Sequence, residues 1–204
     1  DDGSCAYSCT SALAYCENFD LGVGTWTNNG WINDAFGTPS IGTGPLDDIT
    51  GGSFYMYYET SGASGNPITL TSECFDISGL TAPALSFYNH MYGATIGSLN
   101  VYVNGNLEWT MSGNQGPQWN WGQVDLSAYA GVNVTIMFEA TYGGGFTGDI
   151  AIDQVCLDEF IVYGCTDPTA SNYNAAADTD DGSCTYACSG TPTPGNTIST
   201  GSVA

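Results

Sequence analysis

Residues 99–109 read LNVYVNGNLEW, and this stretch decides the fold class. Apolar Leu99, Val101 and Val103 alternate with polar or half-polar residues, the period of a strand that buries one face. Asn104-Gly105 follows at once, and this dipeptide favours the positive backbone φ angles that a two-residue hairpin turn requires. The stretch therefore predicts an antiparallel β-hairpin.

Short strands of the same kind are expected on both sides of this hairpin. No segment keeps an apolar period of 3.6 residues, so no amphipathic helix is predicted. Many short strands separated by glycine-rich turns are typical of an all-β, antiparallel sandwich. The expected strands are residues 53–59, 68–71, 85–89, 132–138 and 149–157.

The charge of the chain excludes several functions. Among 204 residues there are 21 Asp and Glu, one His and no Lys or Arg, so the net charge is −21. Binding of nucleic acid depends on Lys and Arg that neutralise phosphates, so no nucleic-acid partner is expected. A basic membrane patch or a phosphate-binding lysine is equally excluded. Clustered carboxylates must instead be neutralised by water, backbone N–H groups or metal ions.

The cysteines indicate an oxidising compartment. There are eight, none of them in a Cys-x-x-Cys pair, and a single histidine, so disulfides are favoured over a zinc site. No run of about 18 apolar residues occurs, so insertion into a membrane is not expected. The predicted location is extracellular, at a cell surface.

An internal repeat points to a modular protein. Residues 1–9 read DDGSCAYSC, and residues 180–188 read DDGSCTYAC, with seven of nine positions identical. Only the second copy is preceded by a complete acidic loop. We therefore expect the chain to be one stretch of a longer protein built from repeats.

Five blocks resemble a MAM domain, the extracellular jelly-roll module of meprins and receptor phosphatases. They read CENFD, GPLDDITG, FYMYYE, LSFYNHMYG and DIAIDQV, and they occupy residues 16–20, 44–51, 54–59, 85–93 and 149–155. Ile49 replaces a family histidine, and Gln154 replaces a family acid. The resemblance implies a jelly-roll β-sandwich from Cys16 to about Phe160.

A second resemblance concerns residues 164–184. They open with GCTDPTASNYN and close with DDGSC, which is similar to a short acidic, Cys-bounded repeat of large secreted adhesins from gliding bacteria that use type IX secretion. Four segments are predicted: the end of such a repeat at 1–15, the jelly roll at 16–162, a second repeat at 163–188, and a Ser/Thr/Gly/Pro-rich linker at 189–204.

Asp20, Asp48 and Asp153 form the first candidate metal site. The MAM resemblance implies a cation at these positions, and the residues themselves support it. In a jelly roll the first and last strands can lie side by side, which brings Asp20 and Asp153 together. Calcium binds six to eight oxygens from carboxylates, carbonyls and water. The alternative is that these are solvated loop acids.

The acidic repeat offers a second candidate calcium loop, held by a predicted Cys165–Cys184 disulfide. Its oxygen-bearing side chains alternate around a glycine, as calcium loops require, although the spacing is not that of an EF-hand. The alternative is a disulfide-held loop rich in Asx turns and free of metal. The candidate ligands are Asp167, Asn172, Asn174, Asp178, Asp180 and Asp181.

The remaining cysteines allow only a guess at pairing. Cys74 and Cys156 lie on expected strands and are predicted to bridge them, while a Cys9–Cys16 disulfide would close a small loop. Partners of Cys5 and Cys188 are expected outside this chain.

Trp119 and Trp121 are the candidate carbohydrate contacts. Two tryptophans at i and i+2 share one face of a strand, which suits stacking on a flat sugar ring, although such pairs also cover cores. His90 has no nucleophile elbow near it and is expected to be a packed strand residue. No paired carboxylates match those of jelly-roll glucanases, so the chain is not predicted to be an enzyme.

The sequence as a whole predicts a calcium-stabilised adhesion or structural module of a long, repetitive surface adhesin or filament. Its expected partners are neighbouring domains of the same chain and surface glycans or proteins. The alternative is a carbohydrate-binding module of a secreted hydrolase.

Overall fold

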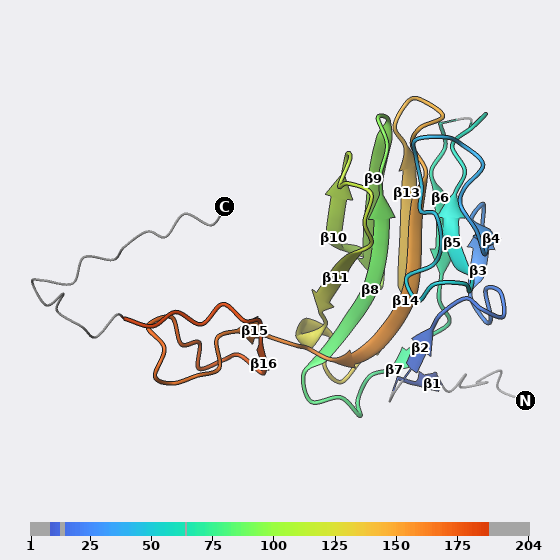
Figure 1. Cartoon of the computed structure of the whole chain (residues 1–204). Coiled ribbons are helices and arrows are strands. Elements are labelled where there is room, and N and C mark those ends of the chain that lie inside the picture. Colours follow the sequence, from blue (N-terminus) through green and yellow to red (C-terminus); the bar gives the residue numbers. More distant parts are fainter. Residues whose placement is uncertain (1–8, 13–14, 64, 188–204) are drawn as a thin grey trace, which may run out of the picture. The chain divides into compact units, whose positions relative to one another are not determined.

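The chain forms two compact units, residues 1–160 and 161–204. The structure is a computed structural model, and it describes residues 9–12, 15–63 and 65–187. The first unit is all-β and consists of two large antiparallel sheets and one small sheet (Figure 1). The predicted β-sandwich is confirmed, and the only helical turn among the described residues is η1 (Ser127–Tyr129).

The two large sheets have the long strands at their centres. The six-stranded sheet runs in the order β11-β8-β14-β5-β4, with β2 also paired to β14, and the five-stranded sheet runs in the order β10-β9-β13-β6-β3. The strands of the six-stranded sheet are β11 (Asn120–Asp125), β8 (Pro83–Met91), β14 (Ile150–Glu159), β5 (Tyr55–Tyr58), β4 (Ile32–Asp34) and β2 (Tyr15–Glu17). Those of the five-stranded sheet are β10 (Asn106–Ser112), β9 (Ile96–Val103), β13 (Ile136–Tyr142), β6 (Ile68–Thr71) and β3 (Thr27–Asn29).

Aromatic side chains join the two sheets in the core. The ring of Phe87 on β8 lies 5.1 Å from the ring of Phe138 on β13 and 5.1 Å from that of Trp109 on β10, in both cases edge to face. Because these contacts come from opposite sheets, the apolar faces of the sheets pack directly on each other. Gly122 on β11 leaves room for this ring, since a Cβ there would lie 2.7 Å from Phe87.

The predicted hairpin is confirmed by β9 and β10. Asn104 and Gly105 have φ angles of 50° and 81°, the left-handed values that this turn needs. The Asn104 side chain also fixes a neighbouring segment, because it accepts the N–H of Thr135 at 2.9 Å and donates to the carbonyl of Asn133 at 2.9 Å.

The single strand predicted at residues 132–138 is in fact two strands in different sheets. β12 (Asn133–Val134) pairs with β7 (Phe75–Asp76), whereas β13 joins the five-stranded sheet. The third strand of the small sheet is β1 (Thr10–Ser11), which pairs with β7 in parallel. Thr10 and Ser11, which the sequence predicts to belong to a preceding repeat, thus pair within the small sheet of the first unit.

Two of the predicted disulfides are wrong. The structure pairs Cys9 with Cys74 and Cys16 with Cys156, and not Cys9 with Cys16 or Cys74 with Cys156. Strand register explains the difference. Cys16 on β2 lies directly opposite Cys156 on β14, and Cys9 precedes a strand that runs in register with the residues after Cys74. Cys5 and Cys188 lie outside the described residues.

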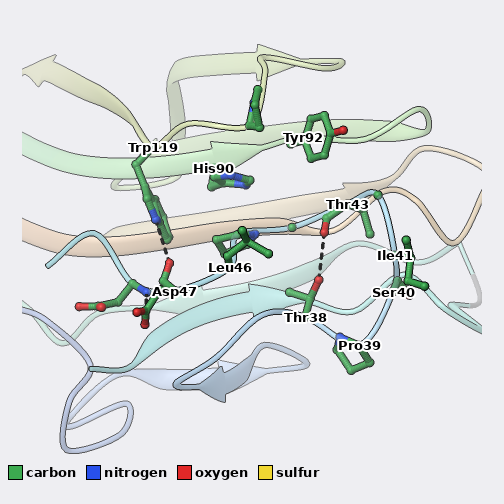
Figure 2. Close-up of a pocket in the computed structure, with 15 residues that line it drawn as sticks. Thr38, Pro39, Ser40, Ile41, Thr43, Leu46, Asp47, His90, Tyr92 and Trp119 are labelled. Carbon is green, nitrogen blue, oxygen red and sulfur yellow. Dashed lines mark hydrogen bonds between the residues drawn. The ribbon is translucent and has the colours of Figure 1, made fainter. Parts of the chain in front are cut away.

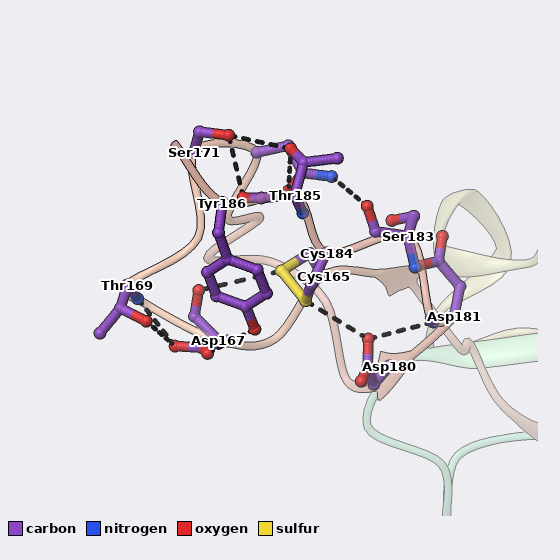
Figure 3. Close-up of a disulfide and its surroundings, with 12 residues drawn as sticks. Cys165, Asp167, Thr169, Ser171, Asp180, Asp181, Ser183, Cys184, Thr185 and Tyr186 are labelled. Atoms are coloured by element: carbon purple, nitrogen blue, oxygen red, sulfur yellow. Dashed lines mark hydrogen bonds between the residues drawn. A yellow bond between two sulfur atoms is a disulfide. The ribbon is translucent and has the colours of Figure 1, made fainter. Parts of the chain in front are cut away.

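The second unit is small and is held by the predicted Cys165–Cys184 disulfide, with a Cα–Cα distance of 4.8 Å (Figure 3). Its two short strands, β15 (Tyr163–Gly164) and β16 (Thr179–Asp180), pair in parallel. In the part of the chain that the structure describes, no helix is long and apolar enough to cross a bilayer.

Candidate functional site

Two of the predicted ligands, Asp20 and Asp153, lie next to or on strands that pair with each other. β2 pairs with β14, and Glu17 lies opposite Val155. This is the side-by-side arrangement of strands that a jelly roll predicts for these two segments. A β-bulge follows Asp153, where Gln154 has a φ of 45°, and Phe19, which precedes Asp20, has a φ of 58°. Positive φ is costly for such residues and concentrates at functional sites. Both residues adjoin a predicted ligand.

The loop at residues 47–54 surrounds the acids with its own backbone. The carboxylate of Asp153 accepts the N–H of Ile49 at 3.2 Å, and that of Asp20 accepts the N–H of Phe54 at 3.1 Å. Asp48 accepts the N–H groups of Thr50 and Ser53, each at 3.1 Å. Backbone donors therefore supply part of the neutralisation that Lys and Arg would supply elsewhere.

Asp153 is the most perturbed of these acids. Only 1% of the residue is exposed, and burial raises the pKa of its carboxyl to about 7. Hydrogen bonds from the N–H groups of Gln154 and Ile49 oppose this shift, whereas the charges of Asp48 and Asp20 add to it. A buried carboxylate beside two others, in a chain without Lys or Arg, is a group that a cation would stabilise.

Asp48 behaves in the opposite way. Burial, the largest single effect, raises its pKa, but the combined hydrogen bonds from Thr50, Ser53 and Gly51 outweigh burial and hold the pKa below its usual range. Asp48 is therefore ionised at neutral pH and remains available as an anionic ligand.

The donors at this end of the sandwich are of the kind that calcium prefers, namely carboxylates and loop carbonyls. Within the described residues, however, no three Asp, Glu, His or Cys side chains stand close enough together to form a ready metal site. The carboxylates of all three aspartates already accept N–H groups of the 47–54 loop.

The acids of the second unit make local turns. Asp167 accepts the N–H of Thr169 at 2.8 Å, and Asp181 accepts the N–H of Ser183 at 2.9 Å. Asn172 binds across the loop to the N–H of Thr185 at 2.8 Å. Asn174 and Asp180 make local turns too, accepting the N–H groups of Ala176 and Gly182, whereas Asp178 accepts the N–H of the distant Val162.

A pocket of about 530 Å³ adjoins the 47–54 loop of the first unit (Figure 2). One wall is the outer face of the six-stranded sheet, with His90, Tyr92 and Trp119, and the other is the loop at residues 38–48. Gly44 donates its N–H to the carbonyl of Tyr92 at 3.1 Å, and the Trp119 indole N–H donates to the carbonyl of Asp47 at 3.0 Å. These two bonds pin the loop to the sheet.

The two tryptophans have different surroundings. Trp119 is half-buried against Tyr55, with ring centroids 5.8 Å apart, and Trp121 on β11 is 39% exposed and lies opposite Tyr88 in the strand register. His90 is a buried strand residue, as predicted. The sequence did not predict the pocket at the 38–48 loop. The feature that could have indicated it is the apolar pair Ile41 and Leu46 in a glycine- and proline-rich stretch.

Curated relatives contain similar stretches. The chain is 39% identical over 135 residues to human "MAM domain-containing glycosylphosphatidylinositol anchor protein 2", a match of 57% of this chain and 14% of that protein. It is 34% identical over 172 residues to rat "MAM domain-containing glycosylphosphatidylinositol anchor protein 1", a match of 76% of this chain and 17% of that protein. The chain thus matches only about a sixth of the length of these relatives.

Solved structures share the fold. The K1 cleaved adhesin domain of Lys-gingipain from Porphyromonas gingivalis W83 superposes with a TM-score of 0.53 at 16% identity, over 72% of this chain and 98% of that one. The K2 domain of the same protein gives 0.51 at 16% identity, with the same coverage of both chains.

The family model described as "MAM domain, meprin/A5/mu" matches residues 16–162, which are also the limits predicted for the jelly roll. Because this model covers most of the chain, and the chain has the sandwich and the pairing of β2 with β14, the chain belongs to the MAM domain family.

Proposed function

We propose that this chain is an extracellular, non-enzymatic adhesion module whose jelly roll binds calcium at Asp20, Asp48 and Asp153. The relatives that share its MAM domain are named for a membrane anchor, which supports a place at a cell surface. Three disulfides among the described residues support an oxidising environment.

The buried carboxylate of Asp153 is the observation that favours calcium. A carboxylate on a residue with 1% exposure must either be paired with a cation or take up a proton. The chain has no Lys or Arg that could be the cation. The neighbouring carboxylates of Asp20 and Asp48, together with the carbonyls of the 47–54 loop, would hold the ion. Calcium would fix this loop to the bulge on β14.

Calcium should raise the melting temperature of the full chain at pH 7.5, because a ligand that binds only the folded state stabilises it. The measurement is a thermal melt in 2 mM calcium and in EDTA. Asp153→Asn and Asp20→Asn should each remove most of the shift. Asp125→Asn is the matched control, since Asp125 also accepts a backbone N–H in a turn but lies on β11.

The second unit is tested in the same series with Asp180→Asn. If that variant loses the calcium shift while Asp153→Asn retains it, the ion belongs to the small unit and the jelly-roll site is wrong. Equal melting temperatures in calcium and EDTA for the unaltered chain would reject both sites.

Residues 163–188 are proposed to be one copy of a module that recurs in a long surface protein. The repeated DDGSC sequence and the disulfide-closed loop support this, as does the resemblance to repeats of secreted bacterial adhesins. Further copies in the full-length sequence are expected, and their absence would contradict the proposal.

A carbohydrate-binding surface is the second candidate. The exposed face of Trp121 beside Tyr88 on the six-stranded sheet favours it, because such faces stack on sugar rings. A glycan array with the unaltered chain and with Trp121→Ala tests this function, and binding that is equal for both proteins would exclude a role for Trp121.

A further inference from the structure

The pocket beneath the 38–48 loop has apolar walls that are open to solvent. Leu46 and Ile41 line it, and these large apolar side chains are 91% and 93% exposed. Figure 2 shows Trp119, His90 and Tyr92 along the sheet side, with Leu46 facing His90. A volume of about 530 Å³ is in the range of sites for small ligands and side chains, about 300–1,000 Å³.

His90 leaves one polar atom in this wall without a partner. The residue is 3% exposed, and its Nδ1 is buried with no hydrogen bond. Burial lowers the pKa of the imidazole to about 4, against the opposing influence of the Pro117 backbone, so the ring is neutral at pH 7. Proline has no backbone N–H, so the bond with Pro117 is one that the imidazole N–H donates to the Pro117 carbonyl. The other ring nitrogen, Nδ1, is then an unprotonated acceptor.

Charge narrows the choice of ligand. Asp47 and Asp48 line one end of the pocket, and the whole chain carries 21 acids and no Lys or Arg. An anionic ligand would meet only repulsion here. A second copy of the chain would bring no positive side chain, so charge does not favour self-association through this pocket. Aromatic faces beside carboxylates are the usual surroundings of a bound organic cation.

We propose that this pocket binds a lysine or arginine side chain of a different protein, presented between apolar neighbours. The aliphatic stem would lie against Leu46, and the cation would lie beside the ring of Trp119 and the carboxylate of Asp47, at the same end of the pocket. The proposal rests on the adhesion function proposed above and names the chemistry of its partner.

The probe is the peptide acetyl-Leu-Lys-Leu-amide, and its matched control replaces lysine with norleucine, which has the same stem and no charge. The readout is the Trp119 indole N–H resonance of the ¹⁵N-labelled full chain, because this group bonds to Asp47. The lysine peptide should shift the resonance and bind about two- to fivefold more tightly than the norleucine peptide, the range of an exposed cation–π contact.

Two variants separate the pocket from the general charge of the chain. Asp47→Asn keeps the acceptor for the N–H groups of Asp48 and Gly52 but removes the charge, so it should lose the preference for lysine. Asp125→Asn removes one charge outside the pocket and should leave the preference unchanged.

The proposal is wrong if the two peptides bind equally or if neither binds. It is also wrong if cellotetraose, a probe for carbohydrate binding, shifts the Trp119 resonance and the peptides do not. Each titration is run in calcium and in EDTA. A calcium-dependent melt without peptide binding would reject the pocket alone, whereas peptide binding without a calcium effect would reject the calcium site alone.

Discussion

At Asp153, burial and ionisation oppose each other within one residue. Its carboxylate accepts the N–H of Ile49 from the 47–54 loop and the N–H of Gln154 from the bulge on β14, and burial raises its pKa to about 7 against these two hydrogen bonds. The sequence indicated this aspartate through its place in the DIAIDQV block, but the bulge that buries it is a property of strand pairing.

The raised pKa of Asp153 predicts a pH dependence of stability. The folded value of about 7 exceeds the unfolded value of 3.8, so the folded state binds more protons between these pH values. In EDTA, this group should therefore reduce stability as pH rises from about 4 to 7, by at most about 1.4 kcal/mol per pH unit. Urea unfolding at pH 5 and pH 7.5 measures the change.

Asp153→Asn is the control for that experiment, because it removes the titration and leaves the other acids in place. The loss of stability between pH 5 and 7.5 should be smaller in the variant than in the unaltered chain. An equal loss in both proteins would show that Asp153 is not the group that titrates. Calcium should reverse the trend, since it binds the ionised form.

At the scale of strands, the hairpin shows how far local sequence reaches. Asn104 and Gly105 specified a turn that the structure contains, because their backbone preferences do not depend on the rest of the chain. Residues 132–138 show the opposite case. Their alternation is continuous, yet the chain changes sheets at Thr135, where the side chain of Asn104 accepts the backbone N–H.

Asn104→Ala should therefore destabilise more than a turn residue alone would suggest. It removes the left-handed preference and two hydrogen bonds to the segment between β12 and β13, so we expect a loss of about 1–2 kcal/mol. The matched change Asn106→Ala removes one long bond of 3.3 Å to Tyr129 and should cost less than half as much. Urea denaturation of both variants decides whether Asn104 joins the two segments.

For the whole molecule, the disulfides divide between the two units. Cys16–Cys156 joins β2 to β14 across 140 residues, whereas Cys165–Cys184 closes a loop with a separation of only 19. In the chain-entropy model these closures stabilise by about 5 and about 3 kcal/mol. All five tryptophans lie in the first unit, so their fluorescence reports its unfolding separately.

The double variant Cys16→Ser/Cys156→Ser should lower the tryptophan-detected melting temperature strongly. Cys165→Ser/Cys184→Ser should leave that transition nearly unchanged, because the fluorophores belong to the other unit. A large shift of the tryptophan transition in the second variant would show that the two units unfold together.

The sequence by itself determined the all-β class, the central hairpin, the MAM limits at residues 16–162 and the Cys165–Cys184 disulfide. These depend on local alternation, turn preference, ordered motifs and short separations, which a chain shows before it folds. Only the tertiary structure decided the pairing of Cys9 with Cys74 and of Cys16 with Cys156, the burial of Asp153 and the pocket beside His90. Each of these depends on strand register between distant segments, and register is set by which faces the core buries.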